Sequence, residues 1–483
     1  MRTIAPLLLL LPLAACGGGG DGGDPASASD IGTLAYVETE CRGTREGFFE
    51  RQALRIRQGD REPVTVFETP EVSLPGQGYL CPLWTGERYG GLSVTREAFQ
   101  AVAVSPDGAS VVFDVTDEFS VYPPLPLNLS PEQKGLFWVR ADGTGLRRLG
   151  PPSRARFFDI VQGSIFEGSG RLNLTFSPDG RTIAFVDKVP GVDGDEADQI
   201  VTVDVATGTR TQVTHLPPAV PPAGRSVDAP TVANPRFVDE RTISFFASAN
   251  PDGLNPEGAL LTMTTRTDGS GLEVPLPVPV ALPGGTVDLR FVITGDRPQA
   301  IIVIVPGTPT NDPPGIAEIW EIFLVDQGNN ILQLTNFRRS DTWSALVDVD
   351  REHVYFTASA DPLGINPTGN CQMFSTDRLG GHLRQLTNFR ETDRSIVGCS
   401  GQAWPRGCSI AAVWQDPRSR TLLFHSNCDP LGTNPNGGQI FAMQPDGSGL
   451  RQLTDSRGLV FESDAAIGEL PGPWAYGPYL YVP

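Results

Sequence analysis

Short runs rich in Val, Ile, Phe and Leu recur along most of this chain, and Pro, Gly, Asp and Asn separate them. Apolar positions at the three-to-four-residue spacing of an amphipathic helix are hard to find. Short apolar runs bounded by turn-forming residues are typical of β-strands. The pattern therefore predicts an all-β protein.

The runs follow one another in a fixed order, and the stretch near residue 100 shows it clearly. AVAVSPDGASVVF (101–113) predicts two strands joined by a turn at Ser105–Gly108. Proline presets φ for such a turn, and Asp-Gly tolerates the left-handed position. After a long loop, GLFWVRADGTGLRRL (135–149) predicts a second hairpin that turns at Asp142–Gly145. One unit thus holds four strands.

This unit recurs, and each copy carries an acidic turn between its first two strands. The turns recur at intervals of about 55 to 70 residues, at Asp107, Asp179, Asp239, Asp296, Asp350 and Asp416. A propeller repeat usually spans roughly 40–45 residues, and the excess here lies in the loops between the second and third strands. Repeated four-stranded units indicate a single β-propeller.

A partial unit precedes these copies. Residues 34–38, 53–58 and 63–68 look like second, third and fourth strands, and the apolar run at 475–483 can supply the missing first strand. Strands from both chain ends would then close the ring and remove its exposed edges. We expect one propeller over 31–483 with seven blades; six blades plus an N-terminal extension is the alternative.

The repeat resembles that of the TolB-like propellers, a periplasmic family with WD-repeat-like blades. SPDGRTIAFV (177–186) and IFAMQPDGSGLRQLTD (440–455) carry the resemblance, which extends over about residues 95–457. It implies a binding propeller on the periplasmic side. TolB itself has an α/β domain before its propeller, and no segment of that size precedes the repeats here. The partners of TolB are therefore not carried over.

The N-terminus reads as an export signal. Arg2 precedes an apolar run at 4–13 that is too short to anchor the chain across a bilayer. The sequence Leu-Ala-Ala-Cys ending at Cys16 resembles the lipobox of bacterial lipoproteins. The resemblance implies a signal peptide at 1–15, a diacylglycerol on Cys16, and a Gly-rich tether at 16–30. Gly17 then favours the outer membrane. An ordinary signal peptide is the alternative.

Charge narrows the classes of partner. The formal net charge is −19, and Lys134 and Lys188 are the lysines of the chain. This composition argues against nucleic-acid binding and against a basic membrane-binding face. We expect other envelope proteins as partners, and contact with the membrane through the lipid alone.

Six cysteines remain after Cys16. An even number in an exported protein suggests disulfides, and no CxxC spacing supports a zinc site. Six cysteines allow 15 connectivities. We expect three pairs, Cys399 with Cys408, Cys41 with Cys81, and Cys371 with Cys428.

Three loops between second and third strands nearly repeat each other: NPDGLNPEGA (250–259), DPLGINPTGN (361–370) and DPLGTNPNGG (429–438). Their turn-forming residues fit connectors that a repeated architecture requires. Equivalent loops on one face of a rigid scaffold also fit a binding surface. Both interpretations remain open. The candidate binding residues are Asn250, Asn255, Asp361, Asn366, Asp429 and Asn434.

One acidic segment is the best candidate for a metal site in the sequence. The densest acidic cluster is Asp187, Asp193, Asp195, Glu196 and Asp198, of which Asp193, Asp195 and Asp198 are candidate Ca²⁺ ligands. The cluster lacks EF-hand spacing, so a solvated acidic loop is favoured and no resident cofactor is expected.

No H-E-x-x-H or G-x-S-x-G motif occurs, and the histidines are His215, His353, His382 and His425. Binding is therefore favoured over catalysis. The alternative is a metal-dependent propeller lyase or hydrolase that acts on a polysaccharide or small substrate, with His353 or His425 at the central channel.

Overall fold

The structure is a computed structural model. It describes residues 31–44, 47–74, 98–117, 129–155, 174–191, 194–217, 232–255, 261–274, 300–304, 321–325, 331–337, 344–349, 352–358, 360–367, 369–389, 410–416, 419–426, 428–433, 439–455, 459–461 and 479–481. Within these residues the chain forms β-strands and one short 3-10 helix, η2 (Pro251–Gly253), so the all-β prediction is confirmed.

Four of the sheets contain four antiparallel strands each, in sequential order, as the repeat predicts. The first comprises β5 (Phe99–Val104), β6 (Ser110–Val115), β7 (Gly135–Arg140) and β8 (Arg147–Gly150). The second comprises β9 (Leu174–Phe176), β10 (Thr182–Pro190), β11 (Glu196–Asp204) and β12 (Arg210–Gln212). The others comprise β19 (Ser344–Val349), β20 (His353–Ala358), β21 (Gln372–Asp377) and β22 (Arg384–Gln385), and β23 (Ile410–Gln415), β24 (Leu422–Ser426), β25 (Gln439–Met443) and β26 (Arg451–Gln452).

Two further sheets have three described strands each. One contains β13 (Val232–Phe237), β14 (Thr242–Ala247) and β15 (Leu261–Arg266), and the other contains β16 (Ala300–Ile304), β17 (Glu321–Val325) and β18 (Ile331–Gln333). The acidic turns at Asp296 and Asp350 lie outside the described residues.

The remaining sheet combines both ends of the chain. Its strands are β1 (Thr33–Thr44), β2 (Gly47–Gln58), β3 (Val64–Glu68), β4 (Val72–Leu74), β27 (Leu459–Phe461) and β28 (Tyr479–Tyr481). β28 pairs antiparallel with β1, with Ala35 opposite Tyr481. The pairing of the N-terminal strands with the last apolar run is thus present, although β1 and β2 are longer than the sequence pattern predicts.

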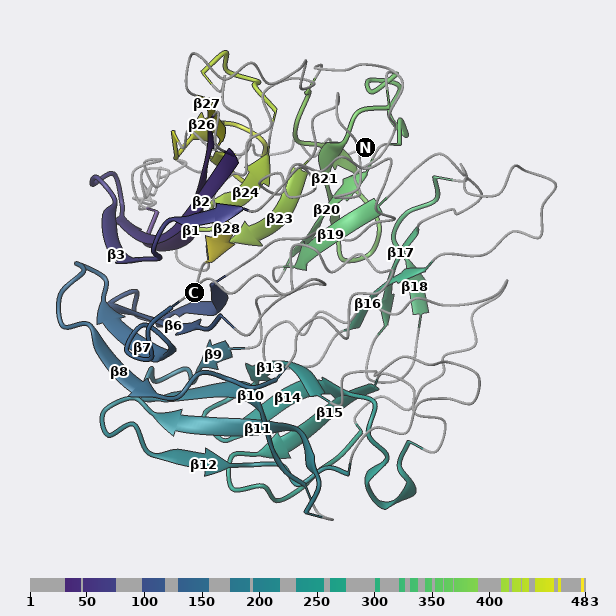
Figure 1. Ribbon diagram of the computed structural model, residues 1–483. Coiled ribbons are helices and arrows are strands. Elements are labelled where there is room, and N and C mark those ends of the chain that lie inside the picture. Colours follow the sequence, from purple (N-terminus) through teal and green to yellow (C-terminus); the bar gives the residue numbers. More distant parts are fainter. Residues whose placement is uncertain are drawn as a thin grey trace, which may run out of the picture.

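The sheets follow one another around a common centre, as the blades of a β-propeller do (Figure 1). First strands of successive sheets lie beside each other, β5 next to β9, β9 next to β13, and β19 next to β23. The hydrophobic core is divided among the joints between neighbouring sheets. Val112 and Leu136 pack with Ile183 and Val201, for example, so one cluster joins the β5–β8 and β9–β12 sheets. Another cluster joins Leu34 of β1 to Leu423 and Ile440 of the last repeat.

Aspartates hold the hairpin turns. In the turn before β10, Asp179 Oδ1 accepts hydrogen bonds from Ser177 Oγ at 2.6 Å and from the Arg181 N–H at 3.0 Å. Hydrogen bonds to the ionised form, that from the Ser177 hydroxyl first, keep the pKa of Asp179 below its usual range. Asp107 accepts the equivalent bond from Ser105 in the turn before β6. The turn chemistry inferred from the sequence is therefore present.

A buried glutamine–threonine pair links the third and fourth strands in several sheets, and we call it the Gln–Thr lock. Gln372 Oε1 accepts from Thr387 Oγ1 at 2.7 Å, and Thr387 Oγ1 in turn accepts from the Met373 N–H at 2.8 Å. Gln199 with Thr214, and Gln439 with Thr454, make the same contacts. The lock fixes the third strand just where the loop from the second strand enters it.

Candidate binding face

The repeated loops share a glycine in the left-handed region of φ at their fourth position. Their fourth residues, Gly253, Gly364 and Gly432, have φ values of 76°, 71° and 68°. A side chain there would meet the steric restriction of the left-handed region, which explains the glycine. Open space surrounds each of these α-carbons, so backbone conformation and not crowding requires the residue.

The first side chain of each loop accepts a hydrogen bond from the backbone further along the same loop. The Asn255 N–H donates to Asn250 Oδ1 at 2.7 Å, and the Asn366 N–H donates to Asp361 Oδ1 at 2.6 Å. In the third copy, Asp429 Oδ1 accepts from the Thr433 N–H at 2.7 Å. A short side chain that bonds its own backbone further along stabilises such turns.

The predicted asparagines are buried anchors and not exposed ligands. Asn255 and Asn366 are each 3% exposed. Asn366 Nδ2 donates to the carbonyls of Ala360 and Asn370, at 3.0 and 2.8 Å, and Asn255 Nδ2 donates to the carbonyl of Ala249 at 3.1 Å. These bonds are internal to the loops, which supports the connector interpretation for these side chains. Asn434, the third equivalent, lies outside the described residues.

Apolar side chains occupy the outer positions of the same loops. Leu254 is 46% exposed, Leu363 43%, Ile365 54% and Leu431 42%. These four residues, the apolar loop tips, make up half of the eight large hydrophobic side chains that are exposed in the described part of the chain. Single exposed leucines are ordinary, but each of the three loops exposes at least one large apolar side chain, at its third position (Leu363 and Leu431) or its fifth (Leu254 and Ile365).

The topology places the loops at one end of their sheets. Strands alternate in direction within each antiparallel sheet, so the loop from the second to the third strand lies opposite the two hairpin turns. The loops follow β14, β20 and β24, and these strands belong to three sheets in the ring of Figure 1. We call this end the loop face.

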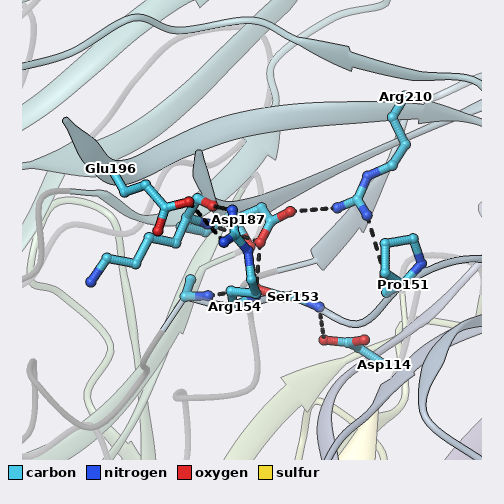
Figure 2. Close-up of polar contacts among 10 residues, drawn as sticks. Asp114, Pro151, Ser153, Arg154, Asp187, Glu196 and Arg210 are labelled. Atoms are coloured by element: carbon cyan, nitrogen blue, oxygen red, sulfur yellow. Dashed lines mark hydrogen bonds and ion pairs between the residues drawn. The ribbon is translucent and has the colours of Figure 1, made fainter. Parts of the chain in front are cut away.

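A polar cluster lies between the β5–β8 and β9–β12 sheets, at the end of these sheets where the second strands run into the loops (Figure 2). Asp187 Oδ2 accepts from Arg210 Nη2 at 2.6 Å, and its Oδ1 accepts from the Arg154 N–H at 2.7 Å. The Ser153 N–H donates to Asp114 Oδ2 at 3.0 Å, and Arg154 bonds Glu196 at 2.8 Å. Ser153 and Arg154, which follow the last strand of the first sheet, are therefore held by hydrogen bonds to carboxylates from both sheets.

Asp114 is unusual within this cluster. It is 2% exposed, and its Oδ1 has no hydrogen-bond partner among the described residues. Burial raises the pKa of Asp114 to about 8; the Ser153 N–H opposes the rise, and the nearby Asp187 adds to it. Asp114 is therefore mostly protonated at neutral pH. Asp114 is thus a buried, neutral carboxyl at the joint between the two sheets.

The remaining predicted residues are not gathered into one site. Asp195 is exposed in the loop before β11, Asp198 faces Lys188 across β10 and β11, and Asp193 lies outside the described residues. No group of three or more His, Cys, Asp or Glu side chains in the described ranges could hold a metal ion. His353 begins β20 beside the ring of Tyr355, and nothing is described for the side chain of His425.

Cys371 and Cys428 are both buried in the hydrophobic cluster between the β19–β22 and β23–β26 sheets. Cys16, Cys81, Cys399 and Cys408 lie outside the described residues, and so does the side chain of Cys41. No helix in the part of the chain that the structure describes is long and apolar enough to cross a membrane.

No family model matches the sequence, and no curated protein matches it. Among solved structures, the chain is similar to an oligogalacturonate lyase from Vibrio parahaemolyticus, with 12% identity, a TM-score of 0.37, and coverage of 57% of this chain and 62% of that one. It is also similar to an acylaminoacyl peptidase from Pyrococcus horikoshii, with 11% identity, a TM-score of 0.44, and coverage of 88% and 51%.

A third similar structure comes from a study of two prolyl endopeptidases, with 13% identity, a TM-score of 0.42, and coverage of 88% of this chain and 50% of that one. The chain thus spans between half and two thirds of the length of these proteins. No activity is carried over from them.

Proposed function

We propose that this protein is a binding propeller of the cell envelope, which holds other envelope proteins against the apolar loop tips. The observation that carries the proposal is the repetition of one rigid loop that exposes large apolar side chains each time. A stiff scaffold that presents apolar side chains binds with little loss of conformational entropy. Large apolar side chains exposed to water in each of three related loops are a feature of interaction surfaces.

The architecture that we propose for this function is a closed ring of seven blades over residues 31–483. Two observations support it: the described strands form seven sheets, and the N-terminal strands share a β-sheet with the C-terminal strand β28 and a hydrophobic cluster with the last repeat. A ring with few free edges holds the loops of different blades at constant separations.

The anchoring proposed with it is a lipid on Cys16, after removal of residues 1–15, which places the propeller at the outer membrane. The lipobox-like sequence and the Gly-rich tether at 16–30 support this. Cys371 and Cys428 are buried in one hydrophobic cluster, and disulfides between such cysteines are typical of exported proteins. For their partners we keep the three-disulfide proposal made from the sequence.

The experiment compares three forms of the full chain by cross-linking in native envelopes. The loop-tip variant carries Leu254→Ser, Leu363→Ser, Ile365→Ser and Leu431→Ser. The control variant carries the same kind of change at four exposed apolar residues outside these loops, Val64→Ser, Leu146→Ser, Leu332→Ser and Leu379→Ser. Circular dichroism and thermal unfolding first establish that all three forms are folded.

We expect wild type and the control variant to capture the same defined envelope protein, and the loop-tip variant to capture at least about tenfold less, as for loss of central interface contacts. Equal capture by all three forms would remove the loop tips from the binding surface. A Cys16→Ser form, expected in the soluble fraction, tests the anchor in the same cells.

A further inference from the structure

The first described residues of the chain lie at the turn end of the propeller, the end that carries the hairpin turns and is opposite the loop face. The Gly32 N–H donates to Asp416 Oδ2 at 3.4 Å, and Asp416 lies in the turn between β23 and β24. Thr33 Oγ1 donates at 2.5 Å to the carbonyl of Gly108, in the turn between β5 and β6. The start of the folded body is therefore held against turns of two different sheets.

The pairing of β1 agrees with this placement. β1 pairs with β2 from Thr33 to Thr44, so the start of β1 lies beside the end of β2. The Gly59 N–H, in the turn from β2 to β3, donates to the Gly32 carbonyl at 3.2 Å. Residues that precede Ile31 thus leave the propeller at its turn end.

The segment between Cys16 and the folded body has a limited reach. Residues 16–30 span at most about 50 Å when fully extended. A Gly-rich chain of this length has a root-mean-square span of only about 22 Å. β20 has six residues, so a sheet is roughly 20 Å from its turn end to its loop end. A lipid at Cys16 could reach a bilayer on the loop face only if the tether passed the rim of the sheets and this height, and such extension costs conformational entropy.

Three of the apolar loop tips belong to neighbouring sheets. Leu363 and Ile365 follow β20, and Leu431 follows β24. The β19–β22 and β23–β26 sheets share one hydrophobic cluster, which contains Cys371 directly after the first of these loops and Cys428 directly before the second. The two loops therefore project from adjoining blades above a common packed base.

We infer that the loop face points away from the membrane that holds the lipid, and that its partner is a water-soluble protein whose apolar recess receives Leu363, Ile365 and Leu431. This inference rests on the proposed function and specifies its partner. An anchor at the turn end leaves the opposite end open to the aqueous compartment. Projecting apolar side chains match a concave apolar surface and supply the central contacts of an interface. The competing occupants are the bilayer and a protein embedded in it.

Energy transfer tests the orientation. A donor fluorophore is attached through p-azidophenylalanine in place of Leu363 on the loop face, or of Leu379, which is 81% exposed in the turn between β21 and β22 of the same sheet. The lipidated full chain is placed on vesicles of equimolar phosphatidylethanolamine and phosphatidylglycerol that contain an acceptor-labelled lipid.

We expect stronger transfer from position 379 than from position 363, and loss of transfer from both positions in the Cys16→Ser form. Equal transfer from the two positions, or stronger transfer from 363, would overturn the orientation. Transfer from 363 that persists in the Cys16→Ser form would identify the bilayer as the occupant of the loop face.

Photo-cross-linking tests the class of partner. p-Benzoylphenylalanine replaces Ile365 in the Cys16→Ser form of the full chain, and the control carries it in place of Leu146, which is 45% exposed in the turn between β7 and β8. After irradiation of intact cells, we expect one defined protein adduct from position 365 in the soluble fraction, and none of that mass from position 146. Adding Leu363→Ser and Leu431→Ser should reduce the adduct at least about tenfold. An adduct that sediments with membranes, or an adduct with phospholipid, would overturn the water-soluble partner.

The outcomes separate this inference from the proposed function. If the loop-tip variant loses its envelope partner but transfer is stronger from position 363, the binding face stands and only this inference fails. If transfer is stronger from position 379 but the loop-tip variant captures its partner as wild type does, the proposed function fails, and the soluble partner at the loop tips fails with it.

Discussion

At the scale of single residues, Asp114 is the place where pH should act on this protein. Its pKa rises from 3.8 to about 8 on folding because it is fully buried with one oxygen unpaired. A group with a raised folded pKa contributes stability that is complete below the unfolded pKa and is lost as the pH climbs through the folded pKa. Ionisation of Asp114 should therefore destabilise the folded state progressively from about pH 4 to pH 8.

Asp114→Asn should remove this pH dependence, because the amide is neutral and its oxygen can still accept from the Ser153 N–H. We expect this substitution to raise the free energy of unfolding by on the order of 1–3 kcal/mol at pH 8, and by less at pH 5. Thermal unfolding at both pH values measures it. Asp187→Asn is the control, and it should destabilise, because Asp187 is bonded to Arg210 and to two backbone N–H groups. An equal increase in stability of Asp114→Asn at both pH values would contradict the raised pKa of Asp114.

At the scale of the element, the Gln–Thr lock joins the third strand of a blade to the residues that follow its fourth strand. Gln372 Oε1 accepts from Thr387 Oγ1 and from the Phe389 N–H, and its Nε2 donates to the Phe389 carbonyl at 2.8 Å. All of these groups are buried. Removing the amide leaves several of them without partners, which is more costly than the loss of one hydrogen bond.

Gln372→Ala is expected to destabilise the fold by about 2–4 kcal/mol, measured by urea unfolding. The matched control is Gln385→Ala in β22, where a half-buried amide donates one bond, to the Thr387 carbonyl. The free energy of unfolding of this control should fall by about 1 kcal/mol or less. If both variants unfold at the same urea concentration, the buried Gln–Thr lock contributes no more to stability than the Gln385 amide does.

At the scale of the whole molecule, the pairing of β1 with β28 joins residues from opposite ends of the chain. Without β28, one edge of β1 would present unpaired backbone groups over Ala35–Val37, and such edges promote aggregation. Cooperative stability across the sheets would also fall, since each sheet packs on its neighbours.

A chain truncated after residue 478 should unfold at a temperature at least about 5 °C lower and elute partly as aggregate in size-exclusion chromatography. A chain truncated after Tyr481 removes the last two residues but keeps β28, and it should behave as wild type. Identical behaviour of both truncated chains would mean that the C-terminal strand does not hold the ring.

The sequence alone was enough to predict the strands and their turns, because these depend on local chemistry. Asp107 and Asp179 hold hairpins at the predicted places, since a carboxylate two residues from a serine and an amide can bond both. Apolar alternation and Pro-Asp-Gly turns likewise gave the order of strands within each unit. The pairing of Tyr479–Tyr481 with β1 followed from counting strands.

The candidate site depends on contacts between distant residues, so less of it could be predicted from the sequence. Asn255 and Asn366 were predicted as binding residues, yet tertiary packing buries them and turns their amides onto loop carbonyls. The apolar tips Leu254, Leu363, Ile365 and Leu431 were overlooked, because a leucine in a sequence reads as core until the fold shows it in solvent. The lock pairs a glutamine with a threonine 15 residues later in three repeats, Gln199 with Thr214, Gln372 with Thr387, and Gln439 with Thr454, and this recurring spacing was a signal that could have revealed it.

Local sequence thus determined which segments are strands and where they turn, because propensity and turn chemistry act over a few residues. Tertiary structure alone decided which polar groups are buried and which apolar groups are not. Burial depends on neighbouring sheets. Asp114, for example, is buried at a joint between two sheets, where it accepts a hydrogen bond from Ser153, 39 residues later in the chain. That joint and the loop face both arise from sheets that meet side by side around one centre.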